Sequence, residues 1–139
     1  MSRGSGSGFG YSGTPLIDKL GIKTEARLKF VSEPKEFRAL LGGLPEGSRF
    51  ASSGSLDFAL LFVKAKSELE KRFAALRDRL EPGGMLWVAW PKKTSGVETD
   101  LTEGVVREFG LASGLVDVKV CAIDETWSGL KFVRRLKDR

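Results

Sequence analysis

The sequence predicts a three-layer α/β domain, in which helices cover both faces of a mostly parallel β-sheet and an antiparallel hairpin closes the chain. Segments 56–63 and 85–90 are almost continuously apolar, as strands are when both faces of their sheet are covered. Segments with helical periodicity alternate with these strands. The last two strand-like runs follow each other without a helix, so we expect them to pair antiparallel.

Two short strands and one short helix are expected in the first half of the chain. "ARLKFV", residues 26–31, is the first strand, and "SRFAS" is a second, shorter one. Between them, "SEPKEFRALLGG" predicts a helix with Pro34 in its first turn and glycines at its end. Phe37, Leu40 and Leu41 form the apolar side of this helix.

A longer helix is expected over residues 66–80. Its apolar stripe consists of Leu69, Phe73, Leu76 and Leu80. The Pro82-Gly83-Gly84 turn is expected to end this helix before the strand at 85–90.

The C-terminal third is expected to hold one helix and the closing hairpin. Asp100 and Glu103 have the spacing of a capping box, which predicts a helix beginning at Asp100. Two further strands lie in 116–124 and 128–136, joined by a tight turn at 125–128.

The chain of 139 residues is long enough for one domain. Residues 1–10, "MSRGSGSGFG", have the composition of a flexible Gly/Ser tail, and residues 11–139 are expected to form a single α/β domain. No strand precedes the glycines of the tail, so they do not form a phosphate-binding loop.

The composition excludes several kinds of site. The chain has no histidine, which removes Ser-His and Cys-His nucleophiles and the usual zinc sites. The only cysteine, Cys121, lies in an apolar run, which indicates a core thiol in a reducing cytoplasm.

No apolar stretch is long enough to span a membrane. The net charge of +5 is spread along the chain without aromatic residues between the basic ones, so nucleic acid is an unlikely partner.

The segment "LDFALLFVKAKSELEKRFAALRDRLEPGGMLWVAW" is similar to the second half of class I methyltransferases, which carry a Pro-Gly-Gly turn before a central strand. The resemblance covers roughly residues 56–135 and implies a Rossmann-like, methyltransferase-like fold that is shortened in its first half. In those enzymes the first strand leads into a glycine-rich turn beside the cofactor. Here "LKFV" leads into "SEPKEF", which has no glycine, and no acidic residue ends the second strand to hold a ribose.

A second resemblance covers nearly the whole chain after the tail. "YSGTPLIDKLGI", "WPKKTSG", "TDLTE" and "GLVDVKVCAIDETWSGLKFVRR" resemble a small bacterial family of unknown function. This resemblance supports the domain boundaries and implies no particular reaction.

The candidate ligand-binding residues lie in loops that follow the expected strands, because ligands of open α/β sheets bind outside the carboxyl ends of the parallel strands. Lys92 and Lys93 could hold a phosphate or carboxylate, with Ser95 in the same loop. Trp127 could stack on a flat ligand, and Asp124 could accept a hydrogen bond or a proton. No catalytic residue and no metal ligand is assigned, because no nucleophile and base can be paired from their spacing.

Each of these residues also has a structural interpretation. Asp124 is an ordinary turn residue, and Trp127 could pack over the end of the sheet. Lys92 and Lys93 could pair with Asp124 and Asp100, and Asp100 is better explained as a helix cap. The sequence leaves the two interpretations open.

The function expected from the sequence is a non-catalytic cytoplasmic binding or interaction module that has a methyltransferase-like fold and has lost the cofactor site. No cofactor is expected, and the partner is an unknown anionic small molecule or a protein. The alternative is a small enzyme or sensor for an anionic metabolite that uses Lys92, Lys93 and Asp124.

Overall fold

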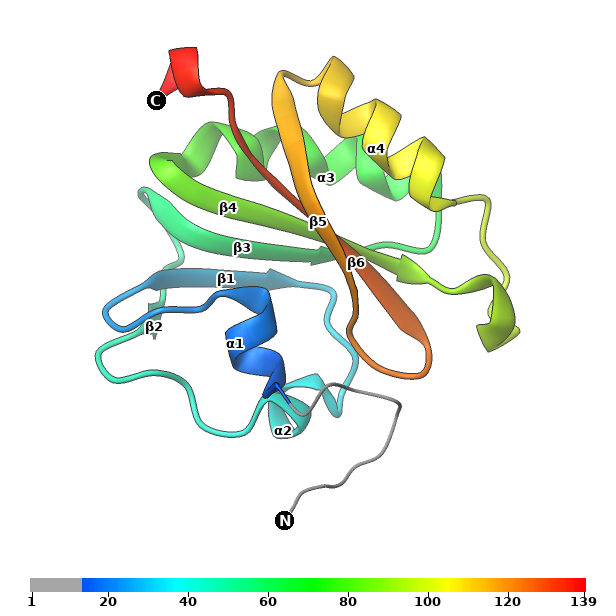
Figure 1. Ribbon diagram of the computed structural model, residues 1–139, viewed down its shortest axis with the longest axis horizontal. Helices are drawn as coiled ribbons and strands as arrows, with labels where there is room; N and C mark the ends of the chain where they lie inside the picture. Colours follow the sequence, from blue (N-terminus) through cyan, green and yellow to red (C-terminus); the bar gives the residue numbers. More distant parts are fainter. Residues whose placement is uncertain (1–13) are drawn as a thin grey trace.

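The computed structural model describes residues 14–139, so the expected Gly/Ser tail lies outside the described residues. Within them, six strands form one sheet in the order β2-β1-β3-β4-β6-β5 (Figure 1). The strands are β1 (Arg27–Val31), β2 (Arg49–Phe50), β3 (Leu56–Phe62), β4 (Leu80–Pro91), β5 (Leu115–Ala122) and β6 (Trp127–Arg134). The first four are parallel, whereas β6 is antiparallel to both β4 and β5. The predicted parallel sheet with a closing hairpin is therefore confirmed.

Helices cover both faces of the sheet (Figure 1). On one face, α1 (Leu16–Leu20) and α2 (Phe37–Leu41) pack against one hydrophobic cluster. On the other face, α3 (Lys66–Arg79) and α4 (Glu103–Ala112) pack against a second cluster. Two 3₁₀ turns, η1 (Lys93–Ser95) and η2 (Leu136–Asp138), follow β4 and β6. No helix within residues 14–139 is long and apolar enough to cross a membrane.

The continuous apolar run of β3 is explained by its position between the two layers. Ala59 and Leu61 belong to the cluster beneath α3 and α4, whereas Phe58, Leu60 and Phe62 belong to the cluster beneath α1 and α2. All five side chains are at most 3% exposed. Alternate residues of a strand face opposite sides, so a strand covered on both sides needs apolar residues at every position.

The "EPGG" segment does not form a separate turn as the sequence suggested. Helix α3 ends at Arg79, and Leu80 already pairs with Leu56 as the first residue of β4. A Cβ atom on Gly84 would lie 2.9 Å from the Leu56 carbonyl oxygen, so this glycine permits close approach of two backbones. A second correction concerns α2, where Leu40 was expected on the apolar side but is 42% exposed.

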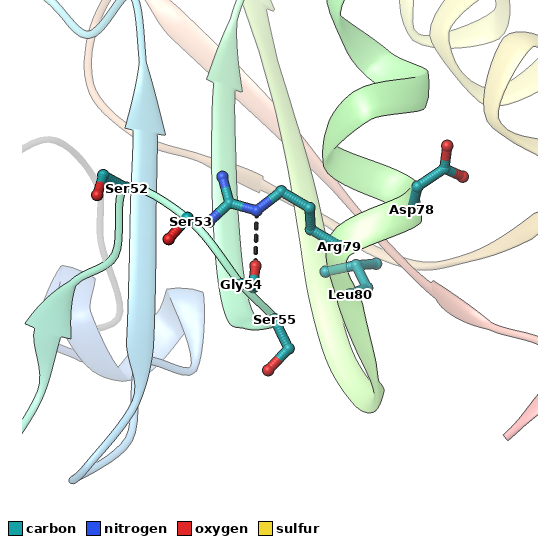
Figure 2. A pocket seen from close by; sticks show the side chains of 7 residues that line it. All are labelled: Ser52, Ser53, Gly54, Ser55, Asp78, Arg79 and Leu80. Atoms are coloured by element: carbon teal, nitrogen blue, oxygen red, sulfur yellow. Dashed lines mark hydrogen bonds between the residues drawn. The ribbon is translucent and has the colours of Figure 1, made fainter.

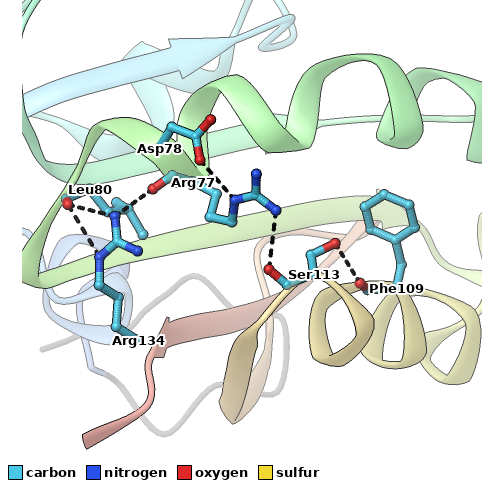
Figure 3. Close-up of polar contacts among 6 residues, drawn as sticks. All are labelled: Arg77, Asp78, Leu80, Phe109, Ser113 and Arg134. Carbon is cyan, nitrogen blue, oxygen red and sulfur yellow. Dashed lines mark hydrogen bonds and ion pairs between the residues drawn. The ribbon is translucent and has the colours of Figure 1, made fainter. Parts of the chain in front are cut away.

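Two arginines bind the carboxyl ends of α3 and α4 (Figure 3). The Arg134 guanidinium, which comes from β6, donates to the carbonyl oxygens of Arg77 at 2.7 Å and Leu80 at 2.8 Å. Arg77 in turn donates to the Ser113 carbonyl at 3.2 Å, just after α4. The last carbonyls of a helix lack partners within it and attract cations, so these contacts tie both helices to each other and to the sheet.

Candidate functional site at the carboxyl edge of the sheet

The carboxyl ends of β1, β3, β4 and β5 lie at the same edge of the sheet. The first three strands are parallel, and β5 runs in the same direction because it is antiparallel to β6, which is antiparallel to β4. Pro91 at the end of β4 pairs with Trp127 at the start of β6. The Lys92 amide also donates to the Thr126 carbonyl at 2.8 Å. The expected convergence of the loop after β4 and the hairpin turn is therefore observed.

Trp127 is a buried part of the fold. Its side chain is 8% exposed, and its ring packs edge-to-face on Phe62, with 5.0 Å between the centroids. Phe62 packs in the same way on Phe37 of α2, so the three rings form a continuous cluster beneath the carboxyl edge. This position matches the structural interpretation of Trp127 and leaves little of the ring available for stacking on a ligand.

Asp124 organises the hairpin turn. One oxygen of its carboxylate accepts hydrogen bonds from the backbone amides of Thr126 and Trp127, both at 2.8 Å. This arrangement is typical of an Asx turn, in which a carboxylate replaces a backbone acceptor.

The loop after β4 is held by its own contacts. The Ser95 hydroxyl donates to the Lys92 carbonyl at 2.7 Å and accepts from the Val97 amide at 3.1 Å. Lys93 is exposed and Lys92 is half-buried. Within residues 14–139, neither lysine forms an ion pair with Asp124 or Asp100. The predicted residues thus share one edge of the sheet.

Asp100 has a role that the sequence did not predict. Helix α4 begins at Glu103, and its cap is Thr102, whose hydroxyl accepts from the Val105 amide at 3.2 Å. Asp100 instead accepts from the Lys66 amide, at the start of α3. The expected capping box of Asp100 and Glu103 is therefore wrong, because Asp100 lies outside the first turn of its own helix.

The loops after β3 and β4 are joined around an open hollow of about 430 Å³ lined by Lys64, Ala65 and residues 98–100. The Thr99 hydroxyl donates to the Lys64 carbonyl at 2.5 Å. The Glu68 carboxylate accepts from the amides of Lys64 and Ala65 at 2.7 and 3.2 Å. These contacts fix the chain at the carboxyl end of β3.

Two other hollows lie at the opposite, amino-terminal edge of the sheet. One is lined by Ser52, Ser53, Gly54 and Ser55 together with Asp78, Arg79 and Leu80 (Figure 2). Within it, Arg79 donates to the carbonyls of Gly54 and Ala51 at 2.7 and 3.1 Å. The other hollow lies around Lys23, Asp57 and Met85. Arg79 is used to hold the serine loop against α3, so the first of these hollows is best explained as part of the scaffold.

The sequence places Ser32 directly after β1 but does not predict its backbone conformation. Its φ angle is +61°, in the left-handed region that usually favours glycine. The next residue, Glu33, forms an ion pair with Arg38 at 2.9 Å, and its side chain is 20% exposed. Glycine is the usual sequence signal for such a turn, whereas here a serine adopts the conformation.

The described part of the chain offers no group of side chains that could hold a metal ion. Within residues 14–139, no three His, Cys, Asp or Glu side chains lie close enough together to hold a metal ion.

Several solved structures that share this fold are methyltransferases. A SAM-dependent methyltransferase from Aquifex aeolicus aligns with a TM-score of 0.60 at 11% identity, over 84% of this chain and 86% of its own. DhpI in complex with SAH aligns with a TM-score of 0.60 at 11% identity, over 88% and 84%. Magnesium protoporphyrin IX methyltransferase (ChlM) from Synechocystis PCC 6803 with bound SAH aligns with a TM-score of 0.56 at 10% identity, over 86% and 78%. No family model matches the chain, and no curated protein is similar to it.

These likenesses overturn the function expected from the sequence. A non-catalytic module that has lost its cofactor site was inferred from the missing glycine after Val31 and the missing acid after the second strand, but SAM-dependent methyltransferases share this fold. Loss of the site is not shown, since Ser32 supplies the turn conformation without glycine. The alternative of a small enzyme or sensor based on Lys92, Lys93 and Asp124 gains no support from these likenesses, and one oxygen of the Asp124 carboxylate is used by its own turn. The fold is that of a class I methyltransferase, shortened in its first half.

Proposed function

We propose that the protein is a methyltransferase that uses S-adenosylmethionine (SAM), and that the cofactor binds in the crevice between the carboxyl ends of β1 and β3. The observation that carries this proposal is the left-handed backbone at Ser32, directly after β1. The chain leaves β1 toward α2 on one face of the sheet and leaves β3 toward α3 on the other. Such a switch point is where open α/β sheets bind their ligands.

The conformation of Ser32 supports a functional turn. A residue other than glycine in the left-handed region costs roughly 1–2 kcal/mol, and such strain clusters at functional sites. Within residues 14–139, no hydrogen bond is formed by the Ser32 hydroxyl. The hydroxyl is therefore available to a ligand in the crevice.

The chain offers suitable groups for the polar part of the cofactor. The Glu33 carboxylate, beside the crevice, could accept hydrogen bonds from the cofactor's ammonium group or from its ribose hydroxyls. Arg38 holds Glu33 from one side, which limits the orientations that the carboxylate can adopt. When bound, SAM would supply an electrophilic methyl group; the chain would orient it and exclude water.

The proposed cofactor site differs in one respect from the cofactor site of class I methyltransferases. β2 ends at Phe50, which pairs with Leu28 near the start of β1, so the residues after β2 do not reach the carboxyl edge. The cofactor would therefore contact mainly the chain after β1 and the Lys64–Ala65 turn after β3. The loops after β4 and β5 border the same edge and are in position to meet the methyl acceptor.

The test is calorimetric titration of the full chain with SAM and with its demethylated product SAH. We expect both to bind, and we expect Glu33→Gln to weaken binding by about tenfold, the equivalent of 1.4 kcal/mol, since it removes a charged acceptor. Ser32→Gly keeps the turn, because glycine adopts the same backbone conformation, and should weaken binding only by the loss of the hydroxyl contact. Glu70→Gln, which changes an exposed acid on α3 away from this edge, is the matched control. A folded protein that takes up neither compound would contradict the proposal.

The resemblance to the small bacterial family, rather than the fold, supports two further proposals. We propose that the chain is a member of that family and works in a bacterial cytoplasm. Cys121 is the single cysteine of the sequence and has no second cysteine for an internal disulfide, which suits a reducing compartment. Fractionation of cells that express the tagged chain tests the compartment, and recovery in an oxidising compartment would contradict it.

A further inference from the structure

Three lysines lie near one another on the sheet face beside α1, where the charges of Lys23 and Lys119 act on Lys131; we call Lys23, Lys119 and Lys131 the lysine cluster. Lys119 and Lys131 are direct register partners in the β5–β6 hairpin. Lys131 also pairs with Trp87, whose side chain belongs to the core beneath α1 and α2. From α1, the Lys19 ammonium donates to the Ala122 carbonyl at 3.3 Å, which joins the helix to β5.

The arrangement of the lysine cluster opposes folding. Like charges directly opposite each other in an antiparallel pair are destabilising. Lys131 is half-buried, and its burial, together with the charges of Lys119 and Lys23, lowers its pKa. Within residues 14–139, no ion pair involves Lys23, Lys119 or Lys131.

Asp117, the acid within β5, does not compensate for this charge. Asp117 pairs with Phe132, which faces α3 and α4, and its carboxylate binds Arg107 of α4 at 2.8 Å. It therefore lies on the opposite face of the sheet from Lys119 and Lys131. No carboxylate within residues 14–139 forms an ion pair with Lys23, Lys119 or Lys131.

We propose that the lysine cluster binds the phosphate group of a small anionic molecule. Directly opposed residues in an antiparallel pair have Cβ atoms about 4.5–5.5 Å apart, so the flexible side chains of Lys119 and Lys131 can reach one anion together. Each ammonium offers three donors, and lysine binds phosphate as a point charge. A bound dianion would reverse the repulsion between the two lysines.

A small ligand fits this face better than a nucleic acid does. Single-stranded nucleic acids need exposed rings for base stacking, whereas Trp87 and Trp127 on this face are 0% and 8% exposed. The partial burial of Lys131 also favours a compact anion that can approach between α1 and the hairpin. This site is separate from the crevice between β1 and β3, so it does not depend on the proposed methyl transfer.

The proposal is tested by calorimetric titration of the full chain with inorganic phosphate and with pyrophosphate, at an ionic strength matched with sodium chloride. We expect saturable binding that is at least tenfold weaker in Lys131→Met and in Lys119→Met. Lys71→Met removes the same charge from the exposed face of α3 and should bind like the wild type. Lys131→Met should also melt at a higher temperature without phosphate, since it removes a desolvated charge, so weaker binding cannot be ascribed to unfolding.

Three results would overturn the proposal. The first is a wild-type chain that binds neither phosphate nor pyrophosphate. The second is binding that is equally strong in Lys131→Met and in the wild type. The third is binding of a fluorescent single-stranded oligonucleotide that Lys131→Met abolishes while neither small anion binds, which would assign the surface to nucleic acid.

Discussion

The Asp100 carboxylate accepts a hydrogen bond of 2.9 Å from the backbone amide of Lys66, the first residue of α3. The acid lies in the loop that precedes α4, but it caps the neighbouring helix. The contact joins the loop after β4 to the start of the helix after β3, at the edge of the sheet where we place the cofactor. Stability of this edge therefore depends on a residue that is distant in sequence from the helix it caps.

Replacing Asp100 with alanine should destabilise the fold by about 0.5–2 kcal/mol, the usual cost of losing a helix cap. Urea denaturation of the purified chain measures the difference. Glu98→Ala, which removes a neighbouring exposed acid, should leave the free energy of unfolding nearly unchanged. Equal losses from both substitutions would mean that the cap contributes nothing.

Replacing Trp127 with alanine should cost roughly 3–5 kcal/mol, as expected for truncating a buried aromatic side chain. The ring packs on Phe62 and is 8% exposed. Trp127→Phe keeps an aromatic ring at this position and should cost less than the alanine variant. Denaturation curves of the two variants test this order, and a stable alanine variant would show that the ring is not part of the core.

Replacing Gly110 with alanine should destabilise the protein by roughly 1–3 kcal/mol, the usual cost of overpacking a core. The added Cβ would collide with the ring of Phe132, although alanine is by itself the better helix former. Gly104 lies in the same helix, and only the Thr102 hydroxyl oxygen, at 3.9 Å, comes near its added Cβ. Gly104→Ala should therefore be neutral or stabilising, so that thermal melts of the pair separate packing from helix propensity.

The ion pair of Arg107 with Asp117 should make part of the stability depend on pH. The hydrogen bond from Arg107 holds the pKa of Asp117 below its ordinary value of 3.8. A carboxyl whose pKa is lowered by folding stabilises the native state above that ordinary value, and the contribution is lost as the pH falls through the lower one. Asp117→Asn should thus reduce stability at neutral pH and bring it toward the wild type in acid. Glu70→Gln, on the exposed face of α3, should show no such convergence.

The parallel sheet could be predicted because β3 is apolar throughout residues 58–62 and β4 throughout residues 85–90, and burial on two faces explains that pattern. The parallel arrangement then fixed the directions of the strands, and these directions place Pro91 and Trp127 at the same edge of the sheet. Local spacing was less informative. Asp100 and Glu103 have the spacing of a capping box, but a carboxylate can accept from any nearby amide, and the amide it uses belongs to α3.

The left-handed turn after β1 could not be predicted, because the expected sign of a tight turn was a glycine. Backbone conformation is set by the surrounding structure as well as by the residue, and Ser32 adopts a positive φ despite its side chain. Leu40 was misplaced for a related reason. α2 has only five residues, Phe37–Leu41, and the two side chains at its ends, Phe37 and Leu41, provide its buried contacts.

The position of β6 between β4 and β5 has a consequence during synthesis on the ribosome. β5 leaves the ribosome before β6, yet it contacts the sheet only through β6. Until β6 emerges, β4 presents an unpaired edge from Met85 to Pro91 that is largely apolar. Such an edge is a template for pairing with other chains. The nascent protein should therefore be most prone to aggregation, and most dependent on chaperones, in the interval between the emergence of β4 and that of β6.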